Sequence, residues 1–368
     1  AFSGMDMRIK YAAKALTNIS ILKLMRKLSV GLDVVSKQEL QLALKAGFKP
    51  SEIQYTPNCV DFEEIKWAAD QEVQITIDNI PMLEEFGKTY GRSKPCCIRF
   101  NPHIMAGGHL KISTGHIDSK FGISVLQLSE IMEVVSRHNM WINGLHIHTG
   151  SDILDTEVFL KGASILLDVA KKFPELDYID FGSGFKVSYH ESDPATDIED
   201  LGKQFSNVFQ EFSEKYGRPL QLWLEPGKFL VSEAGLLLVN ANVVKTTPAT
   251  VFVGVDSGMN HLLRPMMYDS HHEMINISKL DGHTRVYAVV GYICETDTLG
   301  WNVTLSEVTA GDTIAIKNAG AYGFSMASNY NSRLRPAEVL ILDGKAHLIR
   351  RRETLEDLVA TQVTIPEL

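Results

Sequence analysis

The sequence predicts an α/β fold, a (β/α)8 barrel followed by a mostly β C-terminal domain. Short apolar runs alternate with amphipathic stretches up to Glu225, which is typical of repeated strand–helix units around a parallel sheet. Beyond that point helical periodicity fades, and turn pairs such as Asp281-Gly282 and Asp343-Gly344 separate β-rich runs. The 368 residues of the chain are enough for one large domain with a smaller companion.

The barrel is predicted from a count of strands. Eight short apolar runs are strand candidates, at residues 7–11, 32–35, 53–56, 73–77, 96–100, 142–147, 178–181 and 221–224. Helix-like stretches lie between them, at residues 20–28, 38–46, 62–69, 81–90, 128–137, 157–172 and 201–216. Such a series describes a barrel whose active site is built from loops at the C-terminal ends of the strands. We assign residues 1–230 to this barrel.

Residues 231–368 are expected to form the second, β-rich domain. Its strand candidates lie at or beyond the boundary, at residues 229–231, 236–244, 250–255, 284–290, 313–316, 338–342 and 347–350. No long linker separates the two predicted domains.

The composition favours a cytoplasmic enzyme that acts on small molecules. A formal net charge of −9 offers no basic surface to nucleic acid or to an acidic membrane. The four cysteines, Cys59, Cys96, Cys97 and Cys294, show neither a metal-ligand spacing nor a disulfide framework, which suits a reducing compartment. No apolar run approaches the roughly 18 residues of a membrane span, and the start lacks the layout of a signal peptide. Because the first strand begins near residue 1, we expect a preceding segment in the native chain.

Polar and glycine-rich strings follow four of the predicted barrel strands. They are YAAKAL with Lys14 after the first strand, HTGS from His148 after the sixth, GSGF from Gly182 after the seventh and EPGK from Glu225 after the eighth. Because the C-terminal ends of barrel strands meet, these strings should share one pocket. The Gly182-Ser183-Gly184 turn can offer backbone N–H groups to a phosphate. Ser151 can add a hydroxyl there, or it can cap a helix.

Lys14 and Glu225 are the candidates for a reactive amine and an acidic partner. Lys14 ends the first strand, where the barrel interior should provide a partly dry pocket that allows an amine to form a Schiff base. A solvated surface charge is the alternative. Glu225 ends a buried strand, where an unpaired carboxylate is costly. A protonated pyridine nitrogen would be a suitable partner for it, and a structural salt bridge is the alternative.

Two histidines, His146 and His148, lie on or next to the sixth predicted strand. Side chains alternate along a strand, so we expect only one of the two to face the barrel axis, which weakens a zinc site. His148 is better placed as a flat ring stacked on an aromatic cofactor. His261, His271 and His272 add possible ligands, but none has a spacing typical of zinc. We predict no metal.

The β domain contains two further candidates for chemistry. Cys294 and Glu295 follow an apolar run and place a thiol beside acids; a buried, inert thiol is the alternative. Arg264 and Tyr268, in LLRPMMY, can hold a substrate carboxylate with a fork of donors and a phenol. A surface position is the alternative for the arginine.

Together these strings resemble the fold-type III pyridoxal-phosphate decarboxylases, and within them the diaminopimelate decarboxylases, over nearly the entire chain. The matching strings include YAAKAL at Lys14, DVVSKQEL from Asp33, YTPN from Tyr55, KFGI from Lys120, GLHIHTGS from Gly144, RPMMY from Arg264, CETD from Cys294 and GAYGFSMASNYNSRLRPAEVL from Gly320. The sequence departs from the family where Lys228, Leu16 and Ser183 replace the usual arginine, asparagine and glycine. Lys228 cannot reproduce the two-pronged contact of an arginine.

The resemblance implies a bound pyridoxal 5′-phosphate. Lys14 would carry it as a Schiff base, His148 would stack on its ring, and Glu225 would pair with the pyridine nitrogen. The phosphate would be held by Ser151, Gly182, Ser183 and Gly184, and Tyr322 would also reach the cofactor.

The resemblance also implies an amino-acid substrate and a homodimer. Cys294 and Glu295 are expected to come from the partner subunit, so that the active site is shared across the interface and Cys294 becomes the candidate proton donor. Residues expected to contact the substrate are Lys228, Arg264, Tyr268, Glu295 and Tyr322.

The implied reaction is the decarboxylation of meso-2,6-diaminopimelate to L-lysine and carbon dioxide, the last step of lysine biosynthesis. Decarboxylation of ornithine, lysine, arginine or carboxynorspermidine is an alternative, as is a catalytically silent homologue that binds a partner decarboxylase. An amino-acid racemase on the same barrel is disfavoured by Glu225, because alanine racemases place an arginine at the pyridine nitrogen. A vitamin-carrier barrel would lack the β domain.

Overall fold

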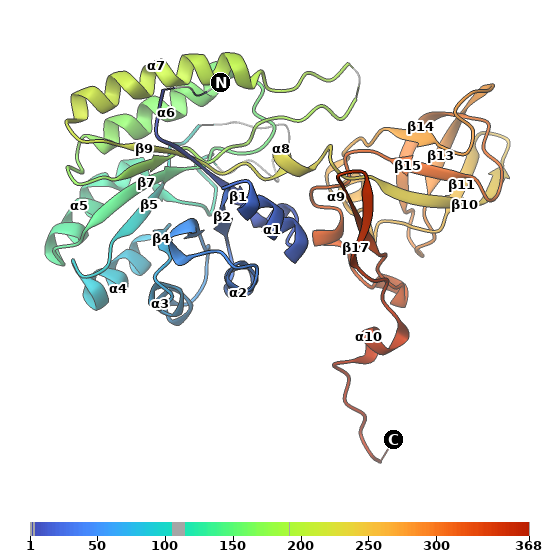
Figure 1. Cartoon of the computed structure of the whole chain (residues 1–368), viewed down its shortest axis with the longest axis horizontal. Coiled ribbons are helices and arrows are strands. Elements are labelled where there is room, and N and C mark those ends of the chain that lie inside the picture. The colour runs from blue at the N-terminus through green and yellow to red at the C-terminus, as the bar shows by residue number, and fades with distance from the viewer. Residues whose placement is uncertain (1, 3, 105–114, 191, 368) are drawn as a thin grey trace. The chain divides into compact units, whose positions relative to one another are not determined.

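The structure is a computed structural model that describes every residue except 1, 3, 105–114, 191 and 368. The chain forms two compact units, one made mainly of residues 1–188 and 192–230 and the other mainly of residues 231–368 (Figure 1). No helix in the described part of the chain has the length and apolar character needed to cross a membrane.

The first unit is a closed barrel of eight parallel strands. Around the barrel the order is β4-β3-β2-β1-β9-β8-β7-β5, and β5 pairs with β4 to close it. Its strands are β1 (Met7–Ala12), β2 (Gly31–Val34), β3 (Ile53–Tyr55), β4 (Gln74–Ile77), β5 (Cys96–Asn101), β7 (Ile142–Ile147), β8 (Tyr178–Asp180) and β9 (Gln221–Leu224). The predicted (β/α)8 barrel is therefore confirmed. A two-residue strand that the sequence did not predict, β6 (Ile123–Ser124), pairs with β5 outside the ring.

Helices follow the barrel strands within three residues of the predicted ranges. They are α1 (Ile19–Lys27), α2 (Lys37–Lys45), α3 (Phe62–Asp70), α4 (Ile80–Tyr90), α5 (Leu128–Arg137), α6 (Thr156–Ala170) and α7 (Ile198–Tyr216). Several begin at a residue whose side chain accepts a backbone N–H of the first turn, as Ser36, Asp61 and Asn79 do. Such caps stabilise a helix start.

Polar side chains are buried on most of the barrel strands. Apolar residues of the helices, such as Leu22 and Leu40, are also buried, and helices cover the outside of such a barrel, so the polar set lines its inside. The strand register pairs Arg99 with His146 and His146 with Asp180, which puts three ionisable groups in one layer. The full set is Lys10, Asp33, Gln54, Thr76, Arg99, His146 and Asp180.

The second unit is mostly β, as predicted. Its six-stranded sheet has the order β12-β15-β10-β11-β13-β14, and β16 pairs with β17 in a separate hairpin. The strands are β10 (Leu237–Thr246), β11 (Val251–Val255), β12 (Met274–Asn276), β13 (Thr284–Val290), β14 (Thr298–Ser306), β15 (Thr313–Ile316), β16 (Glu338–Leu342) and β17 (Lys345–Arg350). Val253, Val289 and Ile314 belong to its apolar core.

Three details of this unit differ from the sequence prediction. Strands β12 and β14 were not predicted, and short helices occur at α9 (Arg264–Tyr268) and α10 (Leu355–Val359). The predicted strand at residues 229–231 is wrong, because these residues form a single helical turn, α8 (Lys228–Val231). The preceding Pro226-Gly227 pair ends the extended backbone, and Leu230 N–H then donates to Gly227 O across the turn (3.1 Å).

Candidate active site

The end of β1 carries Lys14 in a short 3-10 turn, Ala13–Ala15. Ala12 N–H donates to Pro226 O (3.2 Å), which ties this turn to the loop after β9. The Lys14 side chain is exposed in the single chain rather than held in the partly dry pocket expected from the sequence. Its positive charge nevertheless acts on the carboxyls of Asp33 and Glu225 and on the ring of His148, so the ends of four strands converge here.

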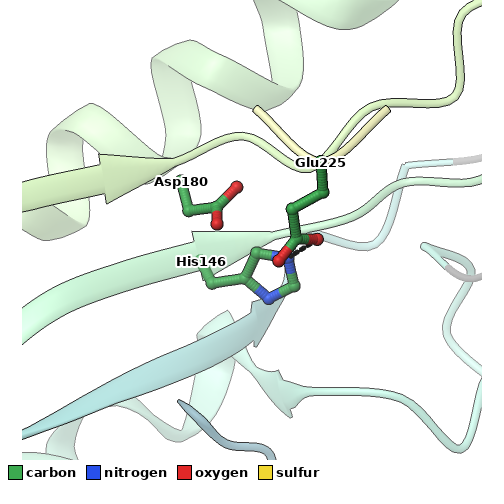
Figure 2. A group of neighbouring side chains, drawn as sticks. All are labelled: His146, Asp180 and Glu225. Atoms are coloured by element: carbon green, nitrogen blue, oxygen red, sulfur yellow. Dashed lines mark hydrogen bonds and ion pairs between the residues drawn. The ribbon is translucent and has the colours of Figure 1, made fainter. Parts of the chain in front are cut away.

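Glu225 is buried at the end of β9 and is held by a histidine. Its Oε2 lies 3.0 Å from His146 Nε2 (Figure 2). Its Oε1 is buried and has no hydrogen-bond partner among the described residues. Burial alone would raise the pKa of the Glu225 carboxyl, but His146 and the positive charge of Lys14 outweigh it and lower this pKa to about 2. The carboxylate therefore stays charged, with one oxygen left for a further donor.

Two other buried carboxyls near Glu225 keep their protons. Burial raises the pKa of Asp33 to about 8, and the negative charge of Glu225 adds to this effect. Burial, followed by the charge of Glu225, raises the pKa of Asp180 well above its usual value. Like charges held close together disfavour each other's ionised form. Of the three acids, Glu225 is thus the one that carries the charge at neutral pH.

His146 and His148 both lie at the site, but only His146 belongs to a barrel strand. His146 is the inward-facing residue on β7, and burial lowers its pKa. Because the Glu225 carboxylate can only accept, Nε2–H of His146 donates to it. Strand β7 ends at Ile147, and His148 lies just beyond, where the alternation of strand side chains no longer applies. Its Nδ1 accepts Ser183 N–H at 3.4 Å. Burial and the charge of Lys14 lower the pKa of His148.

The GSG turn after β8 lies against the HTGS string after β7. Gly184 has a φ of +110°, and a Cβ on it would lie 2.1 Å from Gly150 O. Gly182 has a φ of +61°, and a Cβ there would lie 2.8 Å from His148 Nδ1. Only glycine fits such positions. The close approach confirms that the two strings share one site.

The backbone donors of this turn are partly engaged within the protein. Gly182 N–H donates to Asp180 Oδ1 (2.8 Å), and Ser183 N–H donates to His148. Ser183 Oγ donates to Glu225 O (2.9 Å). Ser151, half-buried in the adjoining string, does not cap a helix, because Asp155 caps α6. Its hydroxyl therefore has no helix-capping role.

Lys228 is buried and forms a close ion pair with Asp152. Asp152 follows Ser151 directly, so this pair joins the HTGS string to the EPGK string. Asp152 could not be predicted from the sequence, because its partner lies 76 residues away along the chain.

The remaining predicted site residues belong to the second unit. The buried Arg264 guanidinium donates to Ser270 Oγ (3.2 Å) and lies 5.2 Å from the centre of the Tyr189 ring. Cys294 and Glu295 are exposed in the loop between β13 and β14. Tyr268, at the end of α9, and Tyr322, with a φ of +57°, are half-buried.

His146, Asp180 and Glu225 are also the described residues whose ligand atoms approach closely enough to surround a metal ion, all within 4.8 Å of one another. A metal would have to displace the proton of Asp180 and the His146–Glu225 hydrogen bond, because metal ligands must be deprotonated. An organic cation that donates a hydrogen bond to Glu225 Oε1 can bind while Asp180 keeps its proton and the His146–Glu225 hydrogen bond stays in place. The donor set therefore fits a protonated ring nitrogen better than a metal.

Comparisons with known proteins agree with this arrangement. The family described as "Pyridoxal-dependent decarboxylase, pyridoxal binding domain" matches residues 1–232. The diaminopimelate decarboxylase of Methanothermobacter thermautotrophicus is 37% identical over 98% of this chain and 87% of its own length. That of Escherichia coli K12 is 34% identical over 96% of this chain and 88% of its own length.

Solved structures are similar over the same range. Diaminopimelate decarboxylase from Helicobacter pylori, complexed with L-lysine, has a TM-score of 0.90 at 35% identity and covers 98% of this chain and 91% of its own. A lysine/ornithine decarboxylase from Vibrio vulnificus has a TM-score of 0.77 at 19% identity and covers 89% of this chain and 85% of its own. That second likeness concerns the fold alone.

The His146–Glu225 contact predicts a large coupling between the two side chains. We expect His146→Ala to lower the free energy of unfolding by about 3 kcal/mol, because it leaves a buried carboxylate unpaired. In a Glu225→Gln background, His146→Ala should lower the free energy of unfolding by clearly less, because the side chain left without its partner is neutral. Urea unfolding of the cofactor-free single and double variants measures both costs.

A surface pair provides the matched control. His138 Nε2 lies 2.9 Å from Glu84 Oε1, which is nearly the same geometry in contact with water. The cycle of His138→Ala and Glu84→Gln should show a much smaller coupling. Equal coupling in the two pairs, or additive costs at His146 and Glu225, would contradict the predicted coupling across the buried hydrogen bond.

Proposed function

The chain belongs to the family of pyridoxal-dependent decarboxylases, and we propose that it converts meso-2,6-diaminopimelate to L-lysine and carbon dioxide. The observation that carries this conclusion is its similarity to diaminopimelate decarboxylases over nearly its full length, at 37% and 34% identity in the two relatives above. The similar structure from Helicobacter pylori is a complex with L-lysine, the product of this reaction. The enzyme is a carboxy-lyase.

Pyridoxal 5′-phosphate is the cofactor, and when bound it accepts the electron pair that the departing carboxylate leaves on the substrate carbon. We infer that Glu225 Oε1 accepts a hydrogen bond from the pyridine nitrogen, while His146 holds Oε2. The support is a buried, charged carboxylate with one unpartnered oxygen. A carboxylate at that position keeps the ring nitrogen protonated, which favours decarboxylation over racemisation.

Further residues of the first unit are proposed to hold the cofactor. Lys14 would bind it covalently, and His148 would lie along the ring. Ser151 and the turn Gly182-Ser183-Gly184 would hold the phosphate. The tight approach of Gly184 to Gly150 O supports this role, because it holds the glycine turn against the string that carries Ser151. Since two N–H groups of the turn are already engaged, we expect Gly184 N–H and the Ser151 hydroxyl to make the main contacts.

Substrate binding is proposed for charged and phenolic groups of both units. Diaminopimelate carries a second ammonium and a second carboxylate at its far end, so it needs both an acid and a base there. Glu295 supplies the acid, and Arg264 supplies a fork of donors for the carboxylate. Cys294 would return a proton to the substrate carbon. Lys228, Tyr268 and Tyr322 complete the proposed set.

We propose that the active enzyme is a homodimer in which Cys294 and Glu295 serve the partner's site. Both side chains are exposed in the single chain. The β16–β17 hairpin also presents an apolar face, with Val339, Ile341 and Leu348 each more than half exposed. Such a face suits burial against another copy of the chain. We place the enzyme in the cytoplasm, where four free cysteines would stay reduced.

The choice of substrate can be tested directly. We expect carbon dioxide release with meso-diaminopimelate to exceed release with ornithine, lysine, arginine and carboxynorspermidine by at least about 100-fold in kcat/KM, because a site that pairs buried polar groups with the substrate rejects molecules lacking them. Radiometric or coupled detection of carbon dioxide measures all five. A preference for any of the other four would overturn the assignment.

Attachment of the cofactor to Lys14 is a second prediction. Lys14→Ala should abolish both turnover and the absorbance band of the attached cofactor, and borohydride reduction of the unaltered enzyme should fix the cofactor to the peptide containing Lys14. Lys10 is the alternative attachment site to test, because burial lowers the pKa of its amine to about 8. We expect Lys10→Met to keep the attachment. Cofactor found on Lys10 by mass spectrometry would contradict the prediction.

The shared active site predicts complementation between subunits. Lys14→Ala and Cys294→Ala lie in different halves of the proposed site, so mixed dimers contain one intact site, and an equal mixture should recover up to about one quarter of normal activity. The control mixture is Lys14→Ala with Glu225→Gln, which belong to the same half and should recover none. Equal behaviour of the two mixtures would rule out sharing.

A further inference from the structure

The loop that carries Cys294 and Glu295 is held by a second loop of the same unit. Asn331 makes two contacts with Cys294: its Oδ1 accepts Cys294 N–H at 3.0 Å, and its Nδ2 donates to Cys294 Sγ at 3.0 Å. The adjacent Tyr330 hydroxyl donates to Glu295 Oε1 at 2.7 Å. The Tyr330 hydroxyl also accepts a longer hydrogen bond from Cys294 Sγ, at 3.9 Å. The shortest contact of Asn331 is thus to Cys294, and the shortest contact of Tyr330 is to Glu295.

These contacts occur on an exposed surface, where each adds little to stability. Cys294, Glu295, Tyr330 and Asn331 are all exposed, and water competes for each hydrogen bond. Exposed side chains that are ordered against one another lose conformational entropy. Such an arrangement is better explained by the direction it gives to the thiol and the carboxylate than by the stability it adds.

The backbone conformation of the second loop favours an asparagine at position 331. Asn331 adopts φ 55° and ψ 26°, a left-handed conformation that asparagine and aspartate tolerate far better than most residues. Asparagine alone combines that tolerance with an amide, which offers an acceptor to the Cys294 N–H and a donor to its sulfur. Arg333, two residues further on, lies 3.9 Å over the Tyr292 ring at the start of the other loop.

Each loop is fixed at its base by a carboxylate. Asp297 is buried under the first loop and accepts Ile293 N–H at 2.9 Å and Met259 N–H at 2.5 Å. Glu353 performs the same task for the second loop, accepting Asn329 Nδ2–H at 2.6 Å and Arg335 N–H at 2.8 Å.

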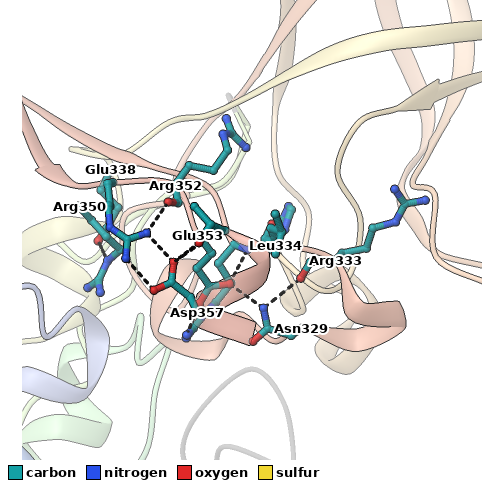
Figure 3. A network of polar contacts seen from close by, with 12 residues as sticks. Asn329, Arg333, Leu334, Glu338, Arg350, Arg352, Glu353 and Asp357 are labelled. Carbon is teal, nitrogen blue, oxygen red and sulfur yellow. Dashed lines mark hydrogen bonds and ion pairs between the residues drawn. The ribbon is translucent and has the colours of Figure 1, made fainter. Parts of the chain in front are cut away.

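Asn329 also closes the second loop on itself. Its Nδ2 donates to Arg333 O at 3.0 Å. Figure 3 shows Glu353 and Asn329 joined on one side of the network and Asn329 joined to Arg333 on the other. The loop that contacts Cys294 is therefore tied to the segment after β17.

We propose that the loop Asn329–Arg333 is a positioning element for the reaction, in which Asn331 directs the Cys294 thiol and Tyr330 directs the Glu295 carboxylate. The inference rests on the proposed roles of Cys294 in proton return and of Glu295 in substrate binding. An amide N–H donated to sulfur stabilises the thiolate more than the thiol, since hydrogen bonds to a charged acceptor are stronger. Asn331 therefore acts on the proton-return step, and Tyr330 acts on binding.

Substitutions of Asn331 and of Tyr330 should have different effects on the steady-state kinetic parameters. Asn331→Asp keeps the backbone conformation and the acceptor for Cys294 N–H but faces the sulfur with a carboxylate. We expect it to lower kcat about tenfold with KM changed less than twofold. Tyr330→Phe removes the hydroxyl that holds Glu295 at 2.7 Å and meets Cys294 Sγ only at 3.9 Å, so it should raise KM about fivefold with kcat retained. Glu353→Gln, which loosens the whole loop, should affect both parameters.

A readout independent of turnover tests the contact itself. Alkylation of Cys294 by iodoacetamide in the cofactor-loaded dimer proceeds through the thiolate, so Asn331→Asp should slow it about tenfold, whereas Tyr330→Phe should change it less than twofold. A Cys59→Ser background removes the other exposed thiol, and mass spectrometry of the Cys294 peptide gives the rate. Arg351→Ala is the matched control, since Arg351 pairs with Asp357 in the same C-terminal region and should change neither alkylation nor kinetics.

Alkylation of Cys294 in Asn331→Asp at the unaltered rate would overturn the inference. The reverse kinetic pattern, in which Asn331→Asp raises KM and Tyr330→Phe lowers kcat, would also overturn it. Slowed alkylation with kcat unchanged would support the contact and instead overturn the role of Cys294 as proton donor. Failure of the inference and failure of the proposed function therefore give different results.

Discussion

The site depends on one buried carboxylate that must remain charged. A carboxylate inside a barrel is stable only when its charge is compensated, and Glu225 is compensated by the His146 hydrogen bond and the nearby charge of Lys14. The same environment would favour protonation of any second acid. Asp33 and Asp180 accordingly hold their protons. Three carboxyls thus share one site without mutual repulsion, and the negative charge is confined to Glu225, the residue proposed to face a ring nitrogen.

Closure of the barrel is what makes this distribution of charge possible. The pairing of β4 with β5 completes the ring, and the register of β5, β7 and β8 then places Arg99, His146 and Asp180 in one layer. Most proteins would fill this space with apolar side chains. Here the interior holds hydrogen-bonding groups beneath the proposed cofactor site. The glycines at 182 and 184 let the loops that follow β7 and β8 approach each other closely.

The fold was largely predictable because its signals are local. Apolar runs of strand length and helical periodicity are properties of short windows, and they located all eight barrel strands. The errors arose where local signals mislead: residues 229–231 are apolar but follow a Pro-Gly turn, and β12 is only three residues long. His148, Glu225 and the glycine turn could be proposed for the site from the sequence because they follow strands. His146, Asp152 and Asn331 could not be assigned roles, because their partners lie 79, 76 and 37 residues away and only the folded chain brings them together.

The two halves of the proposed site hold their reactive groups by different physical means. Glu225 is fixed by low polarity, since any departure from His146 would leave a charge unpaired in the barrel interior. Cys294 and Glu295 are exposed, and water would solvate them in many orientations. Their direction must therefore come from geometry, through a left-handed asparagine and two buried or half-buried carboxylates, Asp297 and Glu353, at the loop bases. A group that enters the site of another subunit, as proposed for Cys294 and Glu295, cannot be buried in its own, so an exposed but rigid loop meets both requirements of the proposal.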